Sequence, residues 1–174
     1  IENFINKEVS LGNYSGIRFL GFSLGNTKIV DKKNIDSGIQ SKNVYVGIMP
    51  FRSLLNQKWV IKIKPEKTEI NIDRDFFIRE KSSYLSDKNI YNSNLNYDLN
   101  FYLANYTTLQ LKEIGLNTKV KGGLIYKSAD KEIIANIKST FEDRGKLRFK
   151  FNKKLNEDLT KFEFFTNGIN LGLF

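Results

Sequence analysis

Residues 145–151, GKLRFKF, alternate strictly between two kinds of side chain. Positions 147, 149 and 151 hold Leu, Phe and Phe, whereas positions 146, 148 and 150 hold Lys, Arg and Lys. Successive side chains of a β-strand point to opposite faces, so this pattern predicts a strand with one apolar and one cationic face. The segments 162–165 and 168–174, FEFF and GINLGLF, repeat the alternation.

Turn-forming residues recur about every ten positions through the second half of the chain. They occupy positions 113–115, 128–130, 142–145, 152–156 and 167–168. The strand-like segments between them include 99–111, 117–126 and 132–141. This spacing predicts a run of antiparallel strands, and since no segment has the pattern of a long helix, parallel βαβ units are disfavoured.

The first half also indicates strands, with one helical turn among them. A strand-like run covers 17–29, a shorter one covers 44–48, and a pair of strands is expected on either side of a turn at 64–67 that contains Pro65. Pro50 suits the first position of a helical turn over 50–55. Residues 1–9 place four apolar side chains on one helical face, which predicts a short amphipathic N-terminal helix.

The 174 residues suffice for one domain with a core, and the polar stretch 81–98 is a possible internal boundary. The chain has no Cys and no His. Disulfides, thiolate metal sites and the commonest general base are therefore excluded, and we expect neither a metal nor another cofactor.

The net charge of +9 is compatible with attraction to anionic lipid or nucleic acid. It equally fits a chain that uses Lys, Asn and Ile heavily. Residues 144–151 faintly resemble the aromatic strand of RNA-recognition motifs, but only Arg144, Gly145 and Phe151 match. We therefore expect no nucleic-acid partner, and a basic nucleic-acid-binding domain stays the less favoured alternative.

Two groupings raise the possibility of an enzyme. Ser128 and Lys131 spell S-x-x-K, yet the companion motifs of penicillin-recognising enzymes are missing. Asp73 and Asp75 lie two apart, as a carboxylate pair would, but no apolar pocket accompanies them. We interpret the first as chance and the second as solubilising charge, and we expect no catalytic residues.

The order of elements from position 7 to 77 resembles the N-terminal region of the TamB family of translocation and assembly modules, which is related to AsmA. The likeness is to its cyanobacterial and plastid (Tic236-type) members in particular. The matching motifs are Lys7–Gly12, Gly16–Phe19, Val44–Ile48, the Pro-Phe-x-Ser-Leu turn Pro50–Leu55, and Trp59–Phe77. Asn6-Lys7 departs from the usual Gly-Arg.

The resemblance implies a mainly-β fold: an elongated, curled antiparallel sheet with an apolar trough, the β-taco, with a short N-terminal helix and one short helical turn. It also implies a segment of an inner-membrane-anchored protein that faces the periplasm. Such proteins guide lipids between inner and outer membranes or support outer-membrane protein assembly. The implied partners are membrane lipids and an outer-membrane assembly protein of the Omp85 type, the latter through regions outside these residues.

Our hypothesis is that nine apolar residues line the trough. They are Phe101, Leu103, Leu109, Leu111, Leu147, Phe149, Phe151, Phe162 and Phe164. The outward Lys and Arg residues would then face solvent or anionic headgroups. The alternative is a purely structural scaffold or interaction module, whose apolar face is covered by a second sheet and whose last strand, 168–174, leaves an edge open to self-association.

Overall fold

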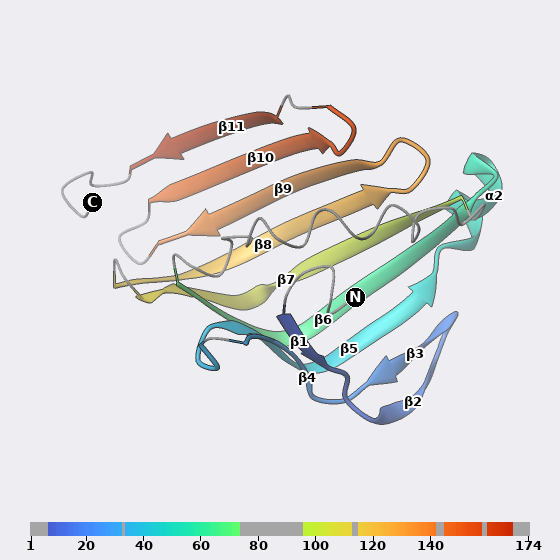
Figure 1. Ribbon diagram of the computed structural model, residues 1–174, viewed down its shortest axis with the longest axis horizontal. Coiled ribbons are helices and arrows are strands. Elements are labelled where there is room, and N and C mark those ends of the chain that lie inside the picture. The colour runs from blue at the N-terminus through green and yellow to red at the C-terminus, as the bar shows by residue number, and fades with distance from the viewer. Residues whose placement is uncertain are drawn as a thin grey trace.

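The computed structural model describes residues 7–32, 34–73, 96–112, 115–141, 145–157 and 160–168. Within these ranges the chain forms one large curled sheet of eleven strands and one short helix (Figure 1). The strands run side by side in the order β1-β4-β5-β6-β7-β8-β9-β10-β11, and the β2–β3 hairpin pairs with β5 beside β4. The predicted mainly-β, curled sheet with one helical turn is therefore confirmed.

Four short strands form the N-terminal part: β1 (Lys7–Ser10), β2 (Tyr14–Arg18), β3 (Gly21–Leu24) and β4 (Thr27–Asp31). Both β3 and β4 pair with the next strand of the sequence, β5 (Gly38–Ile48). β3 pairs with residues 44–47 of β5, and β4 pairs with residues 38–41. The run 17–29 is thus three strands rather than one. The chain turns at Phe19–Leu20, where Leu20 has a φ of 59°, and again at Gly25–Asn26.

The central strands are β5 (Gly38–Ile48) and β6 (Trp59–Ile72), joined through α2 (Pro50–Asn56). The helical turn begins at Pro50 as predicted. The turn expected at 64–67 is wrong, because β6 continues through it and Pro65 pairs with Val44 of β5. The missing N–H of Pro65 is tolerated because the pairing of β6 with its other neighbour lapses between Ile63 and Glu69.

The remaining strands follow one another as a meander. They are β7 (Tyr97–Leu111), β8 (Leu116–Lys127), β9 (Glu132–Thr140), β10 (Lys146–Lys154) and β11 (Thr160–Asn167). All pairs are antiparallel except β6–β7, which is parallel. The sheet is therefore mixed, and the expected absence of parallel pairing is corrected. The connection 73–96 is long enough, when extended, to return along the whole length of β6.

Two further predictions can be compared with the structure only in part, because some of their residues lie outside the described ranges. Residues 7–9 belong to strand β1, so the predicted N-terminal helix is wrong there, and its residues 1–6 lie outside the described residues. Pairing of β1 with β4 explains the correction, because tertiary hydrogen bonds override a weak local helical pattern. The boundary predicted at 81–98 lies outside the described residues except at its end, where Tyr97 and Asp98 begin β7.

A buried apolar cluster lies on one face of this single sheet. Ile70, Ile72 and Val120 form its buried centre. Five half-buried apolar residues pack against them: Ile39, Leu103, Leu109, Leu111 and Ile137. The sheet therefore has one apolar and one polar face, as the alternation predicts.

Candidate functional site: the apolar face of the sheet

A continuous row of apolar residues crosses five neighbouring strands. Phe101 of β7 lies opposite Leu124, which lies opposite Ala135, and the row continues to Phe151 and Phe162 on β10 and β11. Directly opposed residues project from the same face of a sheet. The register therefore brings Phe101 and Phe162, which are 61 positions apart in the sequence, into one apolar line. On the other side the row runs on through Ile63 of β6 and Val46 of β5.

A second row runs parallel to the first, two residues along each strand. It joins Leu103, Gly122, Ile137, Phe149 and Phe164. The rings of Phe149 and Phe164 are in tilted contact, with centroids 5.0 Å apart. Those of Phe149 and Phe151 are 6.3 Å apart, so aromatic contacts link the two rows.

In the second row, β8 contributes Gly122, so no side chain lies between Leu103 of β7 and Ile137 of β9. Its φ is 148°, and an added Cβ would lie 2.1 Å from the carbonyl oxygen of Asn136. Only glycine fits this combination of conformation and close approach.

The other three predicted residues lie on the same face. Leu109 lies opposite Ile70, and Leu111 lies opposite Ile72. Leu147 lies opposite Ser139, which lies opposite Val120. The structure therefore brings all nine residues of the trough hypothesis onto one face of the sheet.

Exposure along this face is not uniform. Val120, at its centre, is 3% exposed, whereas Phe162 and Phe164 on β11 keep 63% and 60% of their surface exposed. The face is thus packed at β6–β8 and open at β10–β11. An apolar ligand would find its accessible surface at the open end.

Sequence reasoning missed residues of the apolar face that lie in segments with two consecutive apolar residues. Leu124 is followed by Ile125, and Ile133 by Ile134, so alternation does not reveal which member of each pair faces the core. Only the registers with β7 and β10 assign Leu124 and Ile133 to the apolar face. For β8 the sequence does contain a signal, because Val120, Gly122 and Leu124 occupy every second position and therefore share one face.

The opposite face carries a row of cations. Lys121 lies opposite Lys138, which lies opposite Arg148. Among the described residues none of the three has a carboxylate within ion-pair distance. Arg148 Nε instead donates a hydrogen bond to Asn136 Oδ1 at 3.3 Å. Like charges placed directly opposite one another repel, so this row favours anionic surroundings.

A hollow of about 420 Å³ adjoins the cationic row. Its lining includes Ile125 and Ile134 together with Tyr102, Asn136 and the two lysines of the row. Lys62 Nζ lies 5.3 Å from the centre of the Tyr102 ring. The lining of the hollow combines apolar side chains with positive charge, whereas the apolar face has no charged residue in either of its two rows.

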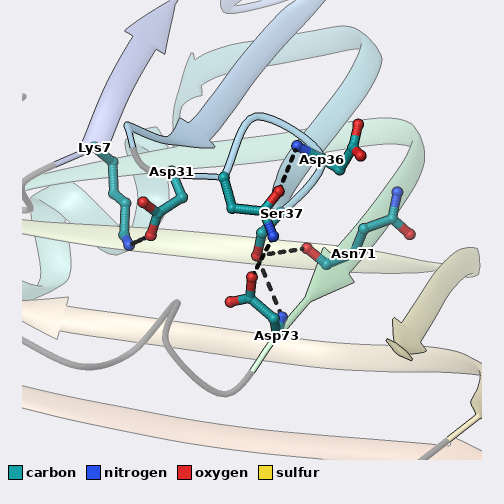
Figure 2. A network of polar contacts seen from close by, with 7 residues as sticks. Lys7, Asp31, Asp36, Ser37, Asn71 and Asp73 are labelled. Atoms are coloured by element: carbon teal, nitrogen blue, oxygen red, sulfur yellow. Dashed lines mark hydrogen bonds and ion pairs between the residues drawn. The ribbon is translucent and has the colours of Figure 1, made fainter. Parts of the chain in front are cut away.

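Polar contacts close one end of the sheet (Figure 2). Lys7 forms a buried ion pair with Asp31, which joins β1 to β4. The Ser37 hydroxyl accepts a hydrogen bond from the backbone N–H of Asp73 at 3.2 Å and donates to the Asn71 carbonyl at 3.4 Å. The Asp73 carboxylate accepts a bond from Asn34 at 2.6 Å. These groups tie the β4–β5 loop to the end of β6, and Asp75 lies outside the described residues.

The S-x-x-K residues are also engaged in backbone contacts. The Ser128 hydroxyl accepts a hydrogen bond from the backbone N–H of Tyr97 at 2.7 Å, and the Lys131 N–H donates to the Ser128 carbonyl. Beside this turn, Lys127 and Glu132 pair at 2.7 Å. The hydrogen bond from Lys127 lowers the pKa of Glu132 against the opposing effect of burial, and the same bond raises the pKa of Lys127. The residues of the S-x-x-K segment thus stabilise the turn between β8 and β9.

Within the described ranges, no helix has the length and hydropathy needed to cross a bilayer. No family model matches the chain, and neither a curated protein nor a solved structure does.

Proposed function

We propose that this chain is a lipid-binding sheet of the TamB type, whose apolar face receives acyl chains and guides them between the inner and outer membranes. One observation carries the proposal: registered apolar rows cross the sheet and end in an exposed group of phenylalanines on β10 and β11. Acyl chains require continuous apolar surface rather than a single indispensable residue. In this proposal the chain binds and guides lipid and performs no catalysis.

The polar face supports the same proposal through its charge. Anionic headgroups would meet Lys121, Lys138 and Arg148, and each basic residue close to an anionic membrane surface contributes about 1 kcal/mol of attraction. The membrane-anchored, periplasm-facing location and the outer-membrane assembly partner come from the family resemblance, and they belong to the proposal on that ground alone.

Solvent extraction and mass spectrometry of the purified protein test the proposal. We expect co-purified phospholipid in the natural chain and its loss in the double variant Phe162→Asp, Phe164→Asp. The matched control is Phe165→Asp, because Phe165 lies on the same strand, is similarly exposed, and lies opposite Arg148 on the polar face. A folded, lipid-free protein, or equal loss of lipid in the control, would overturn the assignment.

A structural interaction module is the second candidate, and strand β11 favours it. All of its eight residues are exposed, and β10 is its one neighbour among the described strands. Such an edge offers free backbone N–H and C=O groups to another strand. This candidate predicts that the protein self-associates at high concentration in sedimentation experiments, and a monodisperse monomer would contradict it.

A further inference from the structure

Helix α2 presents its apolar residues to the outside. Phe51, Leu54 and Leu55 are 83%, 79% and 82% exposed, and α2 contains no buried residue. Ser53 faces the sheet instead, where its hydroxyl accepts a hydrogen bond from the Val60 N–H at 2.9 Å. A helix on a water-exposed surface shows the reverse arrangement, with apolar residues inward. The pattern of α2 is therefore suited to an apolar medium outside the protein.

The β2–β3 turn adds further exposed apolar residues at the same end of the sheet (Figure 1). Phe19 is 87% exposed, and the carbonyl of Leu20 accepts a hydrogen bond from the N–H of Ile48, two residues before α2. The Tyr45 hydroxyl donates to the carbonyl of Phe19 at 2.8 Å. These bonds fix the turn beside the start of the helix.

The turn itself is built from residues that a hairpin does not favour. Leu20 has a φ of 59°, in the left-handed region where Gly or Asn is usual. Two large apolar side chains thus stand at a turn that costs least with small or polar ones. The turn is therefore conformationally strained, and it exposes the apolar side chains of Phe19 and Leu20.

Trp59 and a set of cations complete this end of the molecule. Trp59, the one Trp of the chain, follows α2 and is more than half exposed. The segments 11–20 and 48–60 contain Arg18, Arg52 and Lys58 but no Asp or Glu. Arg18 and Lys58 reach carboxylates of other segments, Glu66 and Asp98, whereas Arg52 is exposed and has none among the described residues.

We infer that α2 and the β2–β3 turn together form a docking surface for an anionic lipid bilayer. Segments that rest in the membrane interface combine Trp, Phe and Leu on the apolar side with Lys and Arg beside them. Both kinds of residue are present in segments 11–20 and 48–60, and of the three cations Arg52 has no carboxylate partner among the described residues. The seven-residue helix would lie along the interface with Phe51, Leu54 and Leu55 among the acyl chains. This inference goes beyond the lipid-binding face, since it concerns the end of the sheet and its residues are separate.

Vesicle flotation with Trp59 fluorescence tests the docking surface. The probes are vesicles of phosphatidylcholine alone and of phosphatidylcholine with an equal amount of phosphatidylglycerol. We expect binding to the mixed vesicles with a blue shift of the Trp59 emission. In the triple variant Phe51→Ser, Leu54→Ser, Leu55→Ser, we expect at least about a tenfold loss of binding, the effect of removing several exposed apolar groups from an interface. Because these side chains contact solvent, the variant should keep its denaturation midpoint.

The matched control is Ile35→Ser. Ile35 is as exposed as Leu54, but it lies in the loop tied to the other end of β6. We expect this variant to bind vesicles like the natural chain. Vesicle flotation of the natural chain reports on the docking surface and solvent extraction of the natural chain reports on the lipid-binding face, so failure of the one and failure of the other are distinguishable. No binding to either vesicle, an unchanged Trp59 spectrum, or an equal loss in Ile35→Ser would overturn the inference.

Discussion

The centre and the C-terminal edge of the apolar face have the same pattern of residues but different surroundings. At the centre, Val120 packs in a cluster with Ile70 and Ile72 and is almost fully buried. At the edge, Phe164 contacts Phe149 in a tilted arrangement and stays 60% exposed. Alternation determines which face a residue occupies, whereas the packing on that face determines whether the residue stabilises the fold or stays accessible to a ligand.

The largest expected difference in stability is between side-chain truncations at the centre and at the C-terminal edge of the apolar face. Ile70→Ala should reduce the free energy of unfolding by about 2–5 kcal/mol, because it removes buried methyl groups and leaves a cavity. Phe164→Ala should cost less, because this exposed residue loses mainly its aromatic contacts with Phe149 and Phe162, each worth about 0.5–1.5 kcal/mol. Urea denaturation of both variants measures the difference. Equal losses would mean that the edge is as tightly packed as the centre.

Two glycines sharpen the comparison by separating backbone strain from packing. Gly122, on β8, and Gly16, on β2, have similar positive φ values, 148° and 141°. A Cβ at Gly122 would collide with the Asn136 carbonyl, whereas nothing lies within 4 Å of a Cβ at Gly16. Both Ala variants should lose about 1 kcal/mol or more to strain.

Gly122→Ala should lose more than Gly16→Ala, because the β8–β9 pairing must also shift. Thermal denaturation of the two variants compares them directly. A larger loss at Gly16 would show that packing around Gly122 relaxes freely, which would contradict the tight centre described here.

The smallest expected contrast concerns two ion pairs of equal length. Lys127–Glu132 and Lys150–Glu163 each span 2.7 Å, but the glutamate side chains are 11% and 56% exposed. Glu132→Gln should lower stability at neutral pH by up to about 1 kcal/mol, and Glu163→Gln by less, because solvent screens the exposed pair.

The pH dependence of the first pair follows from the lowered pKa of Glu132, whose ordinary value is 4.5. A carboxylate with a lowered folded-state pKa contributes stability above its unfolded pKa and loses it as the pH falls through the folded value. The difference between Glu132→Gln and the natural chain should therefore disappear in strong acid. Urea titrations at neutral pH and well below pH 4 check this, and a constant difference would contradict it.

Much of the second half of the fold follows from the sequence alone. Strict alternation at 146–151 and the Phe-Glu-Phe pattern at 162–164, with turn residues between, identify β10 and β11 and the face of Phe149, Phe151, Phe162 and Phe164. The nine trough residues were placed on one face because strands alternate with period two. Their different burial was not predictable, because it depends on how the curled sheet packs rather than on the pattern within a strand.

The first half shows where local patterns mislead. Pro65 indicated a turn, but its lost hydrogen bond falls where β6 and β7 do not pair, so the strand continues. The parallel pairing of β6 with β7 depends on a long connection, and the sequence pattern of neither strand indicates it. The outward direction of the apolar residues of α2 was not predictable either, since a sequence shows that Phe51, Leu54 and Leu55 share a helical side but not which way that side faces.

The parallel contact between β6 and β7 also has a consequence for how quickly the chain folds. Pairs within the β7–β11 meander join strands that are adjacent in sequence and can form by closing short loops. Joining Ile63 to Phe101, or Ile70 to Leu109, instead requires almost forty residues to be closed into a loop before any hydrogen bond between the two strands is gained. The β6–β7 contact is thus expected to form late, after the two antiparallel parts have assembled, and to set the rate at which the sheet is completed.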